Sequence, residues 1–208
     1  MNEFEDLLRS ELAAAAERGF PRVELSHEQS ARLRAHYELL TLWNQRMNLT
    51  AIRTLDDAVR LHYGECLIFG AWMKMEAGAR ICDIGSGAGF PGFVLSVLRG
   101  DCEFTLIDSH QRKVVFLREA ARGSANVDVV GGRVESIKGT WDTLTSRAVR
   151  MSEVIEQVPR LARKVGLLVG LEDCRKLEED SRFKWDAPMR LPWGDQRFAL
   201  FGEARRST

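Results

Sequence analysis

From Arg80 onward the chain alternates short apolar runs with longer segments of helical periodicity, and this alternation constrains the fold more than any other feature. Five runs have strand character, namely RICDI, EFTLID, VDVV, LTSRAV and GLLVGLE. The helical segments between them are PGFVLSVLRG, HQRKVVFLREAARG and MSEVIEQVPRLARKV. Because a strand–helix–strand repeat brings each strand back parallel to the last, the pattern predicts an α/β fold around a mostly parallel sheet.

Both ends of the chain depart from this alternation. The segments RFKWDAPMRL and DQRFALFGEA, joined through PWGD, predict an antiparallel hairpin at the sheet edge. Residues 26–48 open with Ser26 and Gln29 in capping-box spacing, and residues 54–75 open with Thr54 and Asp57 in the same spacing, so both segments are predicted helical. We therefore expect an N-terminal helical extension, residues 1–75, packed on an α/β domain, residues 76–208.

Charge and cysteine content exclude several classes of protein. Lys plus Arg and Asp plus Glu both number 30, so nucleic-acid binding would need a local basic patch. The four cysteines are scattered without a Cys-x-x-Cys pair, which predicts reduced core thiols and no metal site. The N-terminus is acidic, and no run reaches 18 apolar residues, so the sequence predicts a cytoplasmic protein without a membrane span.

The segment ICDIGSGAGFPG, residues 81–92, places four glycines after the first predicted strand. Pro91 suits the start of the following helix, so the loop lies where ligands bind in open parallel sheets. A Walker phosphate loop is excluded because Phe-Pro-Gly follows the glycines in place of Gly-Lys-Ser or Gly-Lys-Thr. Gly87, Gly89 and Gly92 satisfy G-x-G-x-x-G, which leaves a dinucleotide site open, and a plain tight turn is the alternative without a ligand.

Two acidic residues favour a nucleoside ligand. Asp83 ends the first strand, where a carboxylate can organise the loop and face the cationic end of S-adenosylmethionine but would repel a pyrophosphate. Asp108 ends the second strand, where it can accept hydrogen bonds from ribose hydroxyls of either cofactor. The alternatives are a loop cap for Asp83 and a helix cap for Asp108.

Several motifs in order carry a family resemblance: LLTLWNQRMNLTAIR, DIGSGAGFPG, TLIDSHQRKVVFLRE, GGRVES and TSRAV. From about Leu33 to Val149 the chain resembles the bacterial 16S rRNA guanine-N7 methyltransferases, also called glucose-inhibited division protein B. The resemblance implies a class I S-adenosylmethionine-dependent methyltransferase fold, Rossmann-like, with a seven-stranded sheet. It implies methylation of N7 of a guanosine in the decoding-region loop of 16S rRNA, with that rRNA or the small ribosomal subunit as partner, and we expect a monomer.

The resemblance also assigns residues. Gly85 would let the methionine part of the cofactor lie on the backbone, and Phe90 would pack on it. Val134 and Glu135 would flank the adenine, and Arg147 would lie beside the methyl-transfer region. A core aromatic, a surface acid and a structural ion pair are the alternatives for Phe90, Glu135 and Arg147. The expected cofactor-binding set is Asp83, Gly85, Gly87, Phe90, Asp108, Val134, Glu135 and Arg147.

The implied chemistry needs no general base, because guanine N7 carries a lone pair and no proton. Catalysis then consists mostly of orientation and desolvation. Catalytic residues stay unknown at this stage, with Arg147 and His62 as candidates, and helix packing or capping is the alternative for His62.

Two departures from the family pattern bear on the substrate. Glu65 and Cys66 stand where relatives have Asp-Ser, and Leu171-Glu172-Asp173 stands where they have Leu-Lys-Gly, so we expect Glu172 beside Arg147. Three other readings stay open: a methyltransferase for a small molecule or protein, an NAD-dependent oxidoreductase, and a degenerate cofactor-binding module. If RNA is the substrate, we expect basic side chains to border the cleft, notably Arg46, Arg53 and Arg60.

Overall fold

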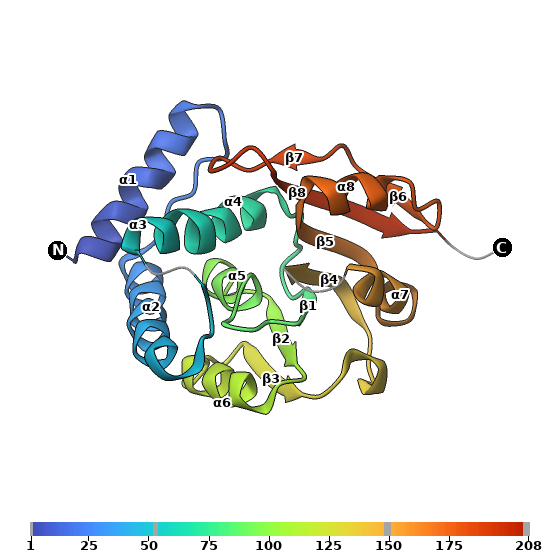
Figure 1. Cartoon of the computed structure of the whole chain (residues 1–208), viewed down its shortest axis with the longest axis horizontal. Helices are drawn as coiled ribbons and strands as arrows, with labels where there is room; N and C mark the ends of the chain where they lie inside the picture. Colours follow the sequence, from blue (N-terminus) through green and yellow to red (C-terminus); the bar gives the residue numbers. More distant parts are fainter. Residues whose placement is uncertain (1, 52–53, 148–150, 206–208) are drawn as a thin grey trace.

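The computed structural model describes residues 2–51, 54–147 and 151–205. Helices cover both faces of a central sheet (Figure 1). The strands are β1 (Arg80–Ile84), β2 (Glu103–Asp108), β3 (Val127–Gly131), β4 (Trp141–Arg147), β5 (Ala162–Gly170), β6 (Phe183–Trp185), β7 (Met189–Arg190) and β8 (Arg197–Ala204). The helices are α1 (Glu3–Glu17), α2 (His27–Met47), α3 (Leu55–Asp57), η1 (Ala58–Gly64), α4 (Glu65–Trp72), α5 (Gly92–Leu98), α6 (Gln111–Ala120), η2 (Val134–Ser136), α7 (Met151–Leu161) and α8 (Leu171–Glu178).

The sheet has the order β3-β2-β1-β4-β5-β8-β6, with β7 also paired to β8. Strands β1 to β5 are parallel, and β8 runs antiparallel to β5. The expected α/β class and the antiparallel C-terminal hairpin are confirmed. Because the strand order reverses between β1 and β4, the carboxyl ends of these strands leave a crevice where a ligand can enter.

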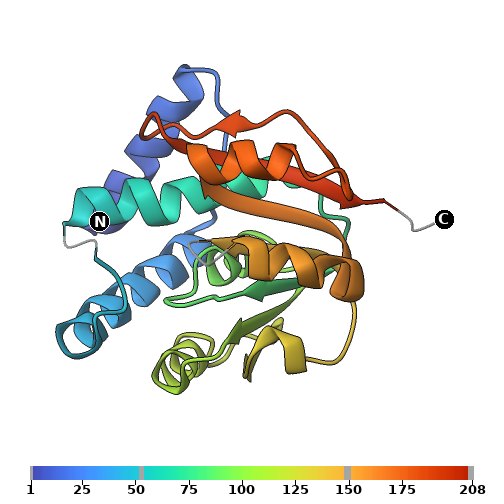
Figure 2. The same cartoon turned by 45° about the vertical axis from the view of Figure 1, so that its right-hand side comes forward.

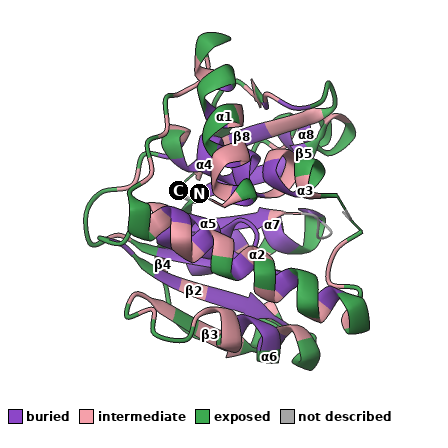
Figure 3. Ribbon diagram, turned by 90° about the vertical axis from the view of Figure 1, so that its left-hand side faces the viewer, coloured by how far each residue is buried: buried purple, intermediate pink, exposed green. Residues whose placement is uncertain are grey.

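Two hydrophobic clusters hold the layers together. One cluster joins α4, α5 and α6 to one face of the sheet and continues outward to α1 and α2. The other joins α7 and α8 to the opposite face, which is turned toward the viewer in Figure 2. Figure 3 shows buried positions on the strands and the inner sides of the helices, and exposed positions on the outer side of α2. The helices before β1 therefore pack directly on the sheet layers.

The N-terminal helices begin where their capping residues predict. Ser26 and Gln29 form the expected capping box at the start of α2, and Thr54 Oγ1 accepts a hydrogen bond from Asp57 N at 3.2 Å. The segment after Thr54 is helical, as expected, but it contains a π-helical part, η1, between α3 and α4. π-Helical turns are rare in proteins, and those that occur are often found at functional sites.

The C-terminal part differs from the expectation in three places, the first being that residues 162–165, expected at the end of a helix, begin strand β5. Strand β5 ends at Gly170, and Leu171 begins α8, a helix that the sequence reading missed. The single strand expected over residues 182–191 is split into β6 and β7, and Pro188 between them has no N–H for a ladder. The sheet counts eight strands among the described residues because β6 and β7, the two parts of the strand expected over residues 182–191, both pair with β8; its path across the sheet keeps the expected seven positions.

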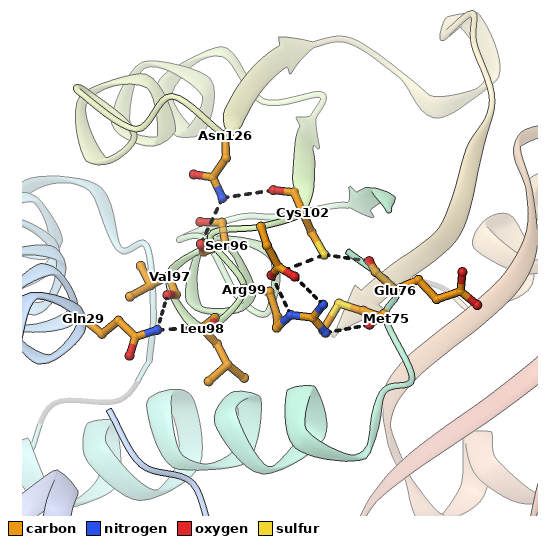
Figure 4. A network of polar contacts seen from close by, with 10 residues as sticks. Gln29, Met75, Glu76, Ser96, Val97, Leu98, Arg99, Cys102 and Asn126 are labelled. Carbon is orange, nitrogen blue, oxygen red and sulfur yellow. Dashed lines mark hydrogen bonds and ion pairs between the residues drawn. The ribbon is translucent and has the colours of Figure 1, made fainter. Parts of the chain in front are cut away.

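A polar network surrounds the C-terminal end of α5 (Figure 4). Gln29 Nε2 donates to Leu98 O at 3.3 Å, and Arg99 Nη1 donates to Met75 O at 2.8 Å. Asn126 Nδ2 donates to the carbonyls of Ser96 and Cys102. Carbonyls at a helix C-terminus lack partners within the helix, so Gln29 and Asn126 complete the end of α5 by donating to its last carbonyls, and the other bonds tie the following turn to its neighbours.

Within the described ranges, no helix is long and apolar enough to cross a membrane. The same residues hold no cluster of three or more His, Cys, Asp or Glu side chains placed to bind a metal ion. All four cysteines are buried free thiols.

Candidate functional site

A cavity of about 730 Å³ opens at the carboxyl ends of β1, β2 and β4. This volume is within the range of small-molecule sites in proteins, about 300–1,000 Å³. Of the nine residues singled out from the sequence, all except Asp83 line this cavity: His62, Gly85, Gly87, Phe90, Asp108, Val134, Glu135 and Arg147.

The glycine loop forms one wall of the cavity. Gly85, Gly87 and Gly89 have φ values of 69°, 59° and 91°, a backbone conformation that side chains disfavour. The N–H groups of Gly85 and Ser86 donate to Ile107 O at 2.8 and 3.0 Å, which anchors the loop to β2. The run of glycines is therefore required by the path of the backbone across the end of the sheet.

Asp83 lies behind the loop and has no exposed surface. Its Oδ2 accepts from Gly92 N at 3.1 Å, and its Oδ1 accepts from Thr145 Oγ1 at 3.1 Å. Burial raises the pKa of Asp83 to about 7, opposed by hydrogen bonds including that from Gly92. In the structure Asp83 thus organises the loop from behind, which is the loop-cap alternative, and its carboxylate does not line the cavity.

Asp108 ends β2 with its carboxylate at the cavity wall. Oδ2 accepts from Gly87 N at 2.9 Å, and Oδ1 accepts from His110 N at 2.8 Å. These bonds fix the carboxylate in a single orientation against the loop. A carboxylate oxygen has more than one acceptor direction, so capacity for ligand hydroxyls remains.

An aromatic stack closes another side of the cavity. The rings of Phe90 and His62 lie 4.4 Å apart at 14°, and Phe90 also meets the edge of Tyr63. His62 Nε2 is 2.7 Å from Thr50 Oγ1. Burial, with a further contribution from the charge of Arg147, lowers the pKa of His62 to about 3. His62 is therefore neutral at physiological pH and carries no charge into the site.

Arg147 ends β4 and meets Glu65, not Glu172. Its Nη2 donates to Leu61 O at 2.8 Å and lies 3.4 Å from Glu65 Oε2. Glu172 is on α8, 84% exposed, and pairs with Lys176 at 2.6 Å. The expected Arg147–Glu172 neighbourhood is wrong, because β5 ends one residue before α8 begins and the helix turns Glu172 to solvent.

The opposite side of the cavity is formed by η2. Val134 and Glu135 line it together with Arg133, and Lys113 of α6 reaches the same cavity. The sequence analysis singled out neither Arg133 nor Lys113 for the site. Arg133 directly precedes the Val134–Glu135 pair, and this adjacency was the available signal.

Of the three basic residues expected from the N-terminal part, the two that the structure describes, Arg46 and Arg60, do not line the cavity. Arg60 Nη2 donates to Glu11 Oε1 at 2.7 Å and does not line the cavity, so the expectation for Arg60 is wrong. Arg46 is also not among the lining residues. Arg53 and Val149 lie outside the described residues. Among the described residues, the cations that line the cavity are Lys113, Arg133 and Arg147, and the acids Asp108, Glu135 and Glu153 line it as well.

Comparison with solved structures identifies the fold. A S-adenosylmethionine-dependent methyltransferase from Aquifex aeolicus matches with a TM-score of 0.59 and 16% identity, over 72% of this chain and 93% of that chain. The 23S rRNA methyltransferase ErmE matches with a TM-score of 0.52 and 14% identity, over 66% of each chain. The architecture is that of class I S-adenosylmethionine-dependent methyltransferases.

Comparison of sequences identifies the family. The family model for GidB, rRNA small subunit methyltransferase G, matches residues 29–187. The ribosomal RNA small subunit methyltransferase G of Nitrosococcus oceani is 36% identical over 155 residues, covering 72% of this chain and 71% of that protein. The Lactococcus lactis protein of the same name is 29% identical over 209 residues, covering 89% and 87%. The chain belongs to the GidB family of rRNA small subunit methyltransferase G proteins.

Proposed function

We propose that this protein uses S-adenosylmethionine to methylate N7 of a guanosine in the decoding-region loop of 16S rRNA. The observation that carries the proposal is the cavity in which the glycine loop, the fixed Asp108 carboxylate and Arg147 converge, in a chain of the GidB family. Membership of that family does not favour the three alternatives: a methyltransferase for a small molecule or protein, an NAD-dependent oxidoreductase, or a degenerate cofactor-binding module. The 16S rRNA, alone or in the small subunit, is the proposed partner of a cytoplasmic monomer.

The lining residues fit the cofactor end to end. Asp108 would accept from the ribose hydroxyls, since both of its oxygens are held in place by loop N–H groups. Val134 and Glu135 would flank the adenine. Gly85 would allow close approach of the methionine part, and Phe90 would pack against it. Asp83 would hold the loop from behind. In this proposal the helices of residues 1–75 complete the site of the domain formed by residues 76–208.

Bound S-adenosylmethionine would supply a methyl group on an electrophilic sulfonium. The protein's part is then to orient guanine N7 toward that methyl and to exclude water, because N7 has no proton to lose. A neutral His62 suits this chemistry, since it cannot protonate N7 and block its lone pair. His62 and Arg147 are accordingly proposed to orient the bound molecules and not to transfer protons.

The cofactor part of the proposal is tested by calorimetry with S-adenosylmethionine, S-adenosylhomocysteine and NAD. We expect both sulfur nucleosides to bind, and the Asp108→Ala variant to bind them roughly tenfold or more weakly, because hydrogen bonds to charged groups contribute about 1.5–3 kcal/mol. Asp128→Ala, an exposed acid on the neighbouring strand, is the matched control and should bind like the unchanged protein. Tighter binding of NAD than of either sulfur nucleoside would contradict the assignment.

A further inference from the structure

Glu65 begins α4 as a carboxylate with no exposed surface. Arg197, at the start of β8, binds the Glu65 carboxylate through two hydrogen bonds: Nε donates to Oε1 at 2.5 Å, and Nη2 donates to Oε2 at 2.6 Å. Burial raises the pKa of the Glu65 carboxyl, and Arg197 and Arg147 oppose this shift. A carboxylate buried this deeply persists only where cations and donors compensate its lost hydration.

Arg147 is the second cation at this carboxylate and the one that reaches the cavity. Its Nη2 lies 3.4 Å from Glu65 Oε2, and the Arg147 side chain is 11% exposed. Arg147 lines the cavity, whereas Glu65 does not. Glu65 therefore lies behind Arg147 and would act on a bound molecule only through it.

The three charges determine how Arg147 is held. Two guanidinium groups and one carboxylate leave a net charge of +1, and Glu65 is the anion that both cations share. Without it, Arg147 and Arg197 would repel each other in a dry environment, where charge interactions are stronger than in water. Arg147 would keep the Leu61 carbonyl and a long contact to Cys66 Sγ at 3.8 Å.

We propose that Glu65 is a positioning residue for the methyltransferase site. It holds the Arg147 guanidinium against the cavity wall, so that the remaining N–H groups of the fork meet an oxyanion of a bound molecule, a carboxylate of the cofactor or a phosphate of the RNA. This inference rests on the proposed function and deepens it. It adds a residue of α4 that touches neither cofactor nor RNA.

The Glu65→Gln variant distinguishes two effects of Glu65 on oxyanion binding: its role in holding Arg147 in place, and its effect on the local net charge. Removal of the carboxylate raises the net charge behind the wall from +1 to +2, which by attraction alone would strengthen oxyanion binding. Loss of the shared anion frees Arg147 to move away from Arg197, which would weaken the same binding. Positioning predicts the weakening, roughly tenfold, as expected for a misplaced charge-assisted hydrogen bond.

A double-mutant cycle tests whether the effect passes through Arg147. Glu65→Gln, Arg147→Gln and the double variant are titrated with S-adenosylhomocysteine and assayed for the KM of undermodified small subunits. If the oxyanion is the cofactor carboxylate, the affinity for S-adenosylhomocysteine falls. If it is an RNA phosphate, the KM for the subunit rises. In either arm, the double variant should match Arg147→Gln alone.

Further variants keep the test valid if Glu65→Gln does not fold. Glu65→Asp retains the charge on a shorter side chain, so it should lose less affinity in the natural background and none in the Arg147→Gln background. Glu11→Gln is the matched control, because Glu11 bonds Arg60 and Trp193 and lies outside the cavity lining. It should lower thermal stability without changing ligand affinity.

Two results would overturn the inference while leaving the proposed function intact. One is an unchanged or increased affinity and an unchanged KM in the Glu65 variants. The other is a loss that is as large with Arg147→Gln present as without it, since Glu65 would then act independently of Arg147. If the unsubstituted protein itself binds no cofactor and modifies no rRNA, the proposed function is refuted, and the inference with it.

Discussion

As the pH rises, the free energy of unfolding of the Asp83→Asn variant should increase relative to that of the natural protein. Asp83 is completely buried, and its two oxygens accept one hydrogen bond each from Gly92 N and Thr145 Oγ1. Asparagine has nearly the same shape: its carbonyl can accept from Gly92 N, and its amide can donate to the Thr145 hydroxyl. The substitution therefore removes the ionisable proton and keeps the anchor of the loop.

The magnitude follows from the shifted pKa. Burial raises the pKa of Asp83 from the usual 3.8 to about 7 in the folded protein. Between these values the folded chain holds a proton that the unfolded chain has lost, so the natural protein loses stability as pH rises, at about 1.4 kcal/mol per pH unit. The loss starts near pH 4 and ends near pH 7. From pH 5 to pH 7 it amounts to about 2 kcal/mol, and the asparagine variant does not undergo it.

The assay is urea unfolding of both proteins at pH 5, 6, 7 and 8. All other titrating groups are shared, so the difference between the two unfolding free energies isolates Asp83. We expect that difference to shift in favour of Asp83→Asn by about 2 kcal/mol from pH 5 to pH 7 and to level off toward pH 8. Asp128→Asn, at an exposed position on β3, should give a flat difference. A flat difference for Asp83→Asn, or one that shifts toward the natural protein, would refute the reasoning.

Two other substitutions test the architecture around the site. Gly92→Ala would place a Cβ 2.4 Å from Leu106 Cδ2 and 2.6 Å from Asp83 Oδ2, so we expect urea unfolding to show a loss of about 1–3 kcal/mol or more, whereas Gly100→Ala, with no atom within 4 Å, should be neutral. Glu172→Lys should leave the methylation rate unchanged, because Glu172 is exposed, pairs with Lys176 and does not line the cavity; a clear rise in rRNA turnover would contradict its placement on α8.

Local patterns were sufficient to predict the strands and the loop that build the cavity. The runs RICDI and EFTLID coincide with β1 and β2, because a short apolar segment bounded by turn residues and followed by a helical pattern has few alternatives. The position of Asp108 at the end of β2 follows directly from that register. These two strands and the glycines between them carry most of the candidate site.

Features that depend on tertiary contacts were not accessible in the same way. Glu65 and Arg197 are 132 residues apart in the chain, and no local pattern marks them as partners. Arg60 was expected at the cleft, but its nearest acid in space is Glu11 of α1. Helix α8 was missed although Cys174 and Leu177 have helical spacing, because the preceding apolar run made the strand look longer than it is.

The most direct test of the central claim is methyl transfer to small ribosomal subunits. Subunits that lack N7-methylguanosine in the decoding-region loop of 16S rRNA are incubated with the protein and S-adenosylmethionine carrying a labelled methyl group, and the label is mapped to a nucleotide and to an atom of its base. The account predicts label on N7 of one guanosine in that loop, and roughly tenfold less or lower still with the Asp108→Ala variant at limiting cofactor. Label on ribosomal protein or on another atom, or no transfer to subunits or free 16S rRNA by a protein that binds S-adenosylmethionine, would contradict it.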